Sequence, residues 1–133
     1  MPSLFEVTAG KLTGPTKGGT VTQATNKSTG VTLNTESGQI TMNDAALAAA
    51  AEVSFTVTND KITATDVVVV NQGSGGTAGS YLVAANTVDA GSYLVGVSAI
   101  AAGSFGITVT NVSGGSLSEA IVINFVALKG ASS

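Results

Sequence analysis

Apolar and polar residues alternate along several short stretches of the chain, which predicts β-strands. In segment 52–58, Val53, Phe55 and Val57 alternate with Ser and Thr, and segment 105–110 repeats the pattern. Successive side chains of a strand point to opposite faces, so each stretch has one face to bury and one to expose. Shorter examples lie at residues 20–23, 31–34 and 39–42. The many Thr and Val residues support the assignment, because both favour extended backbone.

The breaks between these stretches predict how the strands are organised. Gly, Ser and Asn interrupt the chain at intervals of about 8–12 residues, a rhythm typical of sandwiches and barrels. We therefore expect an all-β fold: a single-domain antiparallel β-sandwich, jelly-roll-like, with about eight strands. The sandwich domain is expected over residues 18–130. An N-terminal arm of residues 1–17 precedes it, and a C-terminal tail of residues 131–133 follows.

One stretch is apolar without any alternation. Residues 66–71 contain four consecutive valines between polar ends. A strand that is covered on both faces has this composition. The pattern predicts a central strand of a sheet.

The last stretch, residues 119–129, is also apolar on both faces. The face expected to meet the core consists of Ile121, Ile123 and Phe125. The second face consists of Val122, Val126 and Leu128. Because large apolar patches are rare on monomers, the second face needs a cover from outside its own sheet. We predict that Val122, Val126 and Leu128 form an oligomer interface; the alternative cover is the arm segment 4–7.

Two further patterns leave the local structure open. Residues 44–51 are rich in Ala and predict either a helix of one or two turns or a loop that crosses one end of the sandwich. An Ala-Gly-Ser-aromatic unit recurs every twelve residues, at 78–81, 90–93 and 102–105. Twelve residues suit one turn and one strand. The repeat therefore predicts an antiparallel meander at the edge of the sandwich, with each aromatic starting a buried face.

The composition excludes several classes of function. The chain has 133 residues, a net charge of −3 and only 10% charged residues, with no His, Cys or Trp. A catalytic triad, a thiolate zinc site and a disulfide are therefore excluded, and we expect no enzyme. The five Lys are scattered and no Arg accompanies them, so we expect no nucleic-acid partner. The longest apolar run, 45–51, is far shorter than the roughly 20 residues of a membrane span, so we expect no membrane partner.

The sequence gives only weak support for a cofactor site or a metal site. Residues 73–78 fit the pattern G-x-G-x-x-A, but a strand-like run follows where a nucleotide-binding unit requires a helix. A flexible loop between strands explains the glycines better. There is only weak support for a structural cation bound by Asn59, Asp60 and Asp66, and Asp60 is more simply a turn residue. We expect no cofactor and assign no metal site.

Three strings of sequence resemble small virion proteins of tailed bacteriophages. They are the Thr- and Gly-rich segment 18–34, the segment 37–42 and the segment 113–125. The family in question is the capsid decoration or cement proteins, which often have a jelly-roll or related β-sandwich. The resemblance covers roughly residues 18–130.

The resemblance implies a protein that decorates the outer surface of a bacteriophage capsid and stabilises it against the pressure of the DNA inside. The implied partner is the major capsid protein, and the implied location is the virion, assembled in the bacterial host cytoplasm. A homo-oligomer is expected, with a trimer favoured and a dimer possible. The expected capsid-docking arm contains Leu4, Phe5, Val7 and Leu12; a frayed terminus is the alternative. A tail-fibre or receptor-binding β module of a virion is the alternative function.

Overall fold

The computed structural model describes residues 6–8, 11–13, 18–86 and 101–129. This part of the chain contains β-strands and no helix. The strands are β1 (Glu6–Thr8), β2 (Lys11–Thr13), β3 (Gly19–Thr22), β4 (Val31–Thr32), β5 (Ser37–Thr41), β6 (Glu52–Thr58), β7 (Val67–Ser74), β8 (Tyr81–Asn86), β9 (Ser104–Asn111) and β10 (Val122–Leu128).

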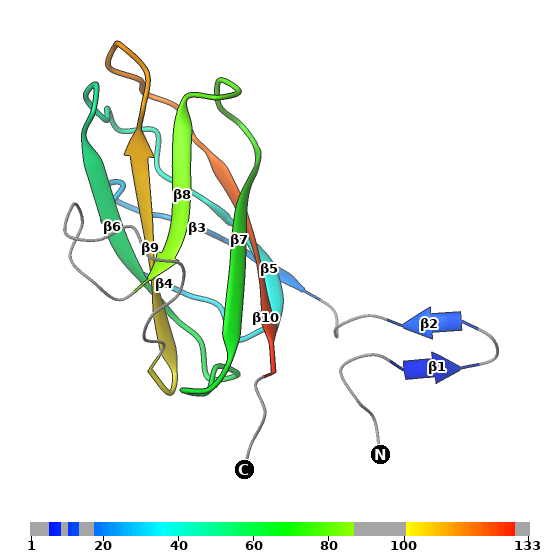
Figure 1. The fold of residues 1–133 in the computed structure, drawn as a ribbon. Coiled ribbons are helices and arrows are strands. Elements are labelled where there is room, and N and C mark those ends of the chain that lie inside the picture. The colour runs from blue at the N-terminus through cyan, green and yellow to red at the C-terminus, as the bar shows by residue number, and fades with distance from the viewer. Residues whose placement is uncertain (1–5, 9–10, 14–17, 87–100, 130–133) are drawn as a thin grey trace.

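Eight of these strands form two four-stranded sheets that face each other (Figure 1). One sheet has the order β3-β5-β10-β7 and the other β4-β6-β9-β8. The all-β prediction and the sandwich of about eight strands are confirmed. Strands β7 and β8, at one edge of each sheet, are consecutive in the chain.

The sheets are mixed, although the alternation pattern predicted purely antiparallel ones. Strand β3 runs parallel to β5, and β4 runs parallel to β6. From β3 to β8 each strand lies in the opposite sheet to the one before it. A parallel pair needs a crossover connection, and here the strand between the two partners supplies it from the other sheet. A jelly roll consists of antiparallel Greek keys, so that part of the prediction is not confirmed.

The core lies between the two sheets and contains the apolar side chains that the alternation assigned to it. Phe55, Phe105 and Phe125 are all buried. The rings of Phe105 and Phe125 meet across the sandwich with their centroids 5.4 Å apart and tilted by 58°. Such a tilted pair adds to the burial of apolar area because ring edge meets ring face.

Strand β7 corrects the prediction of a central strand at residues 66–71. It lies at the edge of its sheet and pairs only with β10 among the described strands. Val68 is buried, whereas Val67 and Val69 are 49% and 48% exposed. A run of valines has no alternation, so the sequence does not distinguish a strand that is covered on both faces from an edge strand with an apolar outer face.

The segment 44–51 is a loop, as the second of its two alternatives predicted. Leu47 is buried and pairs with Leu117 in an isolated antiparallel bridge. Of the repeat units, β8 begins at Tyr81 and β9 contains Phe105; both aromatics are buried, and the two strands pair antiparallel. The unit 90–93 lies outside the described residues.

The first two strands form a small antiparallel hairpin with Val7 opposite Leu12. Among the described residues, neither strand contacts a strand of the two sheets (Figure 1). The described part of the chain also contains no helix that is long and apolar enough to cross a membrane.

Candidate functional site

The outer side of the β3-β5-β10-β7 sheet carries the most distinctive surface of the described chain. We call it the amide face. It presents the side chains of β3, β5, β10 and β7 that point away from the core. None of these four described strands contains a charged residue. Uncharged sheet surfaces of this kind are typical of contacts between proteins, where a charge would have to be desolvated.

An apolar patch lies at one end of the amide face. It consists of Val67, Val69, Val126 and Leu128. The register of β10 and β7 pairs Val126 with Val69 and Leu128 with Val67, so the four side chains are direct neighbours. The two β7 valines are about half exposed, and the two β10 side chains are partly buried. Because the register holds these four side chains side by side, the patch is continuous.

A row of amide side chains crosses the middle of the same face. Gln39 of β5 and Asn71 of β7 flank Asn124 of β10 in the strand register. Gln39 Nε2 donates to Asn124 Oδ1 at 3.0 Å, and Asn124 Nδ2 donates to Asn71 Oδ1 at 3.2 Å. The row therefore has a direction: its donors all point toward β7. We refer to these three residues as the amide row.

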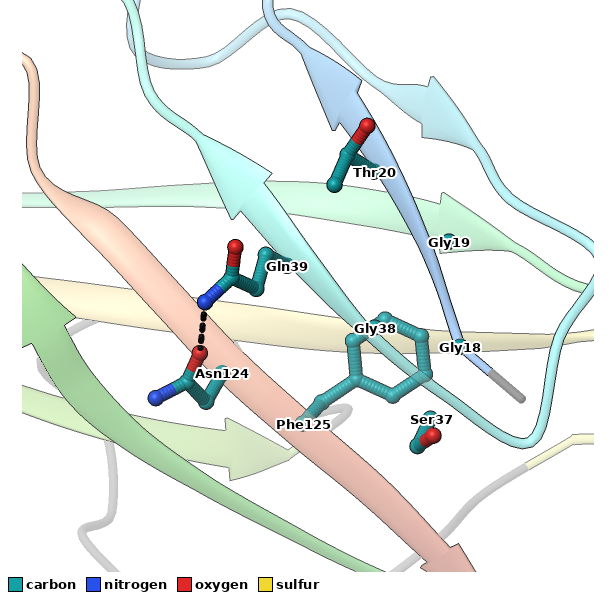
Figure 2. Close-up of a pocket in the computed structure, with 8 residues that line it drawn as sticks. All are labelled: Gly18, Gly19, Thr20, Ser37, Gly38, Gln39, Asn124 and Phe125. Carbon is teal, nitrogen blue, oxygen red and sulfur yellow. Dashed lines mark hydrogen bonds between the residues drawn. The ribbon is translucent and has the colours of Figure 1, made fainter. Parts of the chain in front are cut away.

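A shallow groove of about 380 Å³ opens where the amide row meets β3 (Figure 2). Thr20, Gln39 and Asn124 line it together with the backbone at Gly19 and Gly38. A side chain at Gly38 is not possible without rearrangement, because its Cβ would lie 2.7 Å from Leu33 and 2.9 Å from the Gly19 carbonyl oxygen. The groove offers amides, hydroxyls and peptide groups, and its lining contains no carboxylate or amine that could perform acid–base chemistry.

Charged side chains gather at the two ends of the sandwich. At one end, Glu119 holds the glycine loop between β7 and β8. Its carboxylate accepts hydrogen bonds from Tyr81 Oη at 2.6 Å and from the Thr77 N–H and hydroxyl at 3.1 and 3.0 Å. The Tyr81 bond, followed by the Thr77 bonds, lowers the pKa of Glu119. Burial, together with the bond and charge of Glu119, raises the pKa of Tyr81.

Lys27 is buried near the same end, and its side chain connects neighbouring loops by hydrogen bonds. Its Nζ donates to the backbone carbonyl oxygens of Asn43 and Glu119. Burial lowers the pKa of Lys27, and the negative charges of Asp44 and Glu119 oppose that shift. The Lys27 ammonium thereby joins three loops that are distant in sequence.

Asp66, one of the residues that the sequence offers as a ligand for a structural cation, lies at the opposite end of the sandwich. Its carboxylate accepts bonds from the Thr63 N–H and hydroxyl at 2.9 and 2.7 Å and contacts Lys129 Nζ at 2.9 Å. Asn59 is fully buried and donates to the Thr35 carbonyl oxygen. The carboxylate oxygens of Asp66 are thus engaged by protein donors. No group of three or more potential metal ligands occurs among the described residues.

The residues proposed from the sequence are placed as follows. Val126 and Leu128 lie in the apolar patch, whereas Asn124 separates Val122 from them on the same face. Val7 and Leu12 lie opposite each other in the β1–β2 hairpin. Leu4 and Phe5 of the proposed arm lie outside the described residues.

Sequence reasoning missed the contribution of β7 and the amide row. Val67 and Val69 were assigned to a covered strand, and three amides on three strands have no common local pattern. One signal was present: Asn124 interrupts an otherwise apolar strand. A polar residue in that position indicates a face with hydrogen-bonding partners on neighbouring strands.

No protein-family model, no curated protein and no solved structure matches the chain.

Proposed function

We propose that this protein is a viral structural protein that decorates the outer surface of a tailed-bacteriophage capsid and stabilises it. The proposal combines the resemblance of segments 18–34, 37–42 and 113–125 with the properties of the fold. Decoration requires a rigid body, a surface for association and an adhesive segment. It requires no catalytic residue.

The observation that carries the proposal is the uncharged amide face with its continuous apolar patch. Continuous exposed apolar patches usually mark interaction sites. In this proposal the face serves association between copies of the chain, and Val122, Val126 and Leu128 contribute to it. A trimer suits three-fold sites of a capsid and a dimer suits two-fold sites.

The second proposed contact is between the N-terminal arm and the major capsid protein. The β1–β2 hairpin does not contact the sheets within the described residues, which supports a role outside the sandwich. The apolar side chains Leu4, Phe5, Val7 and Leu12 would offset the entropy lost when the arm becomes ordered on the capsid. The protein would then be located on the capsid surface of the virion after assembly in the host cytoplasm.

Binding to undecorated heads tests the proposal. Purified protein is mixed with undecorated heads from a panel of tailed phages and sedimented, and the heat resistance of the heads is measured. We expect saturable co-sedimentation and a higher temperature of DNA release. A full-length chain with Ser at positions 4, 5, 7 and 12 is expected to lose binding while Leu82→Ser, on the other sheet, retains it. Failure of the natural chain to bind any head would contradict the proposal.

A receptor-binding or tail-fibre module is the second candidate. The polar groove beside Gln39 and Asn124 favours it, because amides and hydroxyls pair well with sugar hydroxyls. The lack of Trp and of a carboxylate in the groove counts against it. A specific hit on a glycan array that Gln39→Ala abolishes would favour this function over decoration.

A further inference from the structure

We infer that the apolar patch is the docking site of the β1–β2 hairpin of the same chain, so that the N-terminal arm is a strap that closes over the amide face. The structure shows the open arrangement, in which neither strand of the hairpin contacts a strand of the two sheets (Figure 1). The sequence already offers the arm as the alternative cover of this face. Docking goes beyond the proposed function, because it requires neither a capsid nor a second copy.

The arm leaves the sandwich at the end of the sheet where the patch lies. Strand β3 begins at Gly19, whose register partner on β5 is Gly38, and Gly38 pairs in turn with Phe125 of β10. The start of β3 is therefore level with the residue next to Val126. Because β3 and β10 run in opposite directions, the chain that precedes Gly19 extends toward the level of Leu128.

The patch is within reach of the arm. Strands of a sheet lie about 4.8 Å apart, so β10 is roughly 10 Å and β7 roughly 14 Å from β3. Residues 14–18 connect β2 to β3, and five residues span at most about 17 Å. The other exposed aliphatic residues among the described ones, Leu82 and Val112, lie near the opposite end of the sandwich, beside the loop that Glu119 holds. The tether therefore favours the patch.

The hairpin has an apolar face of suitable size. Val7 and Leu12 are register partners, so they occupy the same face of the two strands. Glu6 and Lys11 occupy positions of the other face, so docking through Val7 and Leu12 leaves both charges in water. A two-stranded hairpin is marginally stable in water by itself, so it needs a surface to pack against. An uncharged aliphatic patch supplies that surface without desolvating a charge.

The covalent connection favours the hairpin over a second copy as the occupant of the patch. A second copy has to offset the loss of its translational and rotational freedom, which requires an extensive contact. A short flexible linker instead holds a segment at an effective concentration on the order of millimolar. Four aliphatic side chains form a small contact for two separate chains, but they suit a segment that is already tethered beside them.

Docking makes the arm a regulator of the two contacts of the proposed function, and this consequence rests on that function. The hairpin and a second copy compete for the patch, so a closed strap weakens association between free copies. The same Val7 and Leu12 contribute to the proposed contact with the capsid. Capture of the arm by the capsid then frees the patch, and copies associate more readily where they are bound.

Disulfide formation within one chain tests the docking. The chain has no cysteine, so Leu12→Cys can be combined with Val69→Cys in the patch. The matched control combines Leu12→Cys with Gln39→Cys, which is exposed on the same face and only one strand from β3. An arm that does not dock reaches position 39 at least as readily as position 69. We expect the bond between positions 12 and 69 to form about tenfold faster than the control bond, at a rate independent of protein concentration.

Dye binding tests the docking without a cross-link. Val7→Ser together with Leu12→Ser removes the apolar face of the hairpin and is expected to raise the fluorescence of ANS, which binds exposed apolar surface, about twofold. Adding Val69→Asp is expected to reverse the increase. The control Thr8→Ser with Thr13→Ser changes the other face of the hairpin and is expected to leave the fluorescence unchanged. Circular dichroism establishes that the variants are folded.

Three results would each overturn the inference. They are equal rates for the two cysteine pairs, a rate that rises with protein concentration, and unchanged dye fluorescence after Val7→Ser with Leu12→Ser. A rate that rises with concentration would assign the patch to a second copy. Because neither experiment contains a capsid, these outcomes are separate from failure of the proposed function.

Discussion

The two outer faces of the sandwich are built from different side chains. The outer side of the β4-β6-β9-β8 sheet, which we call the hydroxyl face, carries Ser54, Thr56, Thr58, Thr108 and Thr110. Ser54 and Thr108 are hydrogen-bonded at 2.8 Å across β6 and β9. The amide face carries the apolar patch and the amide row instead. Both sheets bury their inner faces in the same core, so the core does not explain the difference.

Exposed apolar residues occur on both sheets, but among the described side chains they are continuous on the amide face alone. Leu82 of β8 is 43% exposed, and its neighbour in the register is Thr110. A single exposed leucine among hydroxyls is ordinary for a protein surface. Val67 and Val69 have similar exposure but lie beside two further aliphatic side chains. The comparison teaches that the arrangement of the exposed apolar residues, and not their exposure, distinguishes the surface that we propose as a contact from the other outer face.

The largest expected effect separates the two sides of β10. Phe125 points into the core, and Val126 points to the amide face. Phe125→Ala is expected to lower the free energy of unfolding by about 3–5 kcal/mol, because it leaves a cavity beside Phe105. Val126→Ala removes two partly exposed methyl groups and is expected to cost about 1 kcal/mol. Urea denaturation of dilute monomer measures both; equal losses would mean that the outer side of β10 is also core.

A charge on each face is the next test. Val126→Asp on β10 is expected to give a folded chain that no longer self-associates, because an unpaired carboxylate cannot be desolvated in a contact. Its counterpart Thr56→Asp on β6, an exposed position of the hydroxyl face opposite Gly106, is expected to leave self-association unchanged. Light scattering with circular dichroism measures both properties. Unfolding or aggregation of the Val126→Asp chain would assign that position to the core and remove the distinction between the faces.

The smallest expected effect concerns the loop that connects the two sheets. The pKa of Glu119 is lowered by its bonds to Tyr81 and Thr77, so the folded state holds the ionised form more tightly than the unfolded state does. The stability that these bonds contribute is present above the ordinary value near 4.5 and is lost as the pH falls through the lowered pKa of the folded state.

Melting temperatures between pH 6 and pH 2 measure this contribution. The natural chain is expected to lose more stability over this range than Glu119→Gln, which keeps hydrogen-bonding capacity but does not titrate. Glu36→Gln removes a carboxylate elsewhere and serves as the control for the loss of one negative charge. Identical profiles for the natural chain and Glu119→Gln would show that the loop is held without the carboxylate charge.

The inner faces of the strands were predictable because alternation is a local property. Phe55, Val57, Phe105, Ile107 and Val109 were assigned to the core from their spacing and are buried. Local spacing reports which side chains share a face but does not report which strands are neighbours. The parallel pairing of β3 with β5 therefore had no signal in the sequence.

The candidate site was predictable only in part, for the same reason. Val126 and Leu128 were identified because β10 is apolar on both faces. The role of β7 was predicted wrongly, since four consecutive valines suit a covered strand equally well. The bonds of the amide row join residues 39, 71 and 124, and only strand order brings these residues together.

The sequence by itself determined that this protein is an all-β sandwich without the residues for triad or thiolate chemistry. Both conclusions depend on residue types and short-range periodicity. The tertiary structure decided which of the outward side chains become neighbours. Register and strand order are long-range pairings, and a change in either would scatter the apolar patch and break the amide row while leaving every local pattern intact.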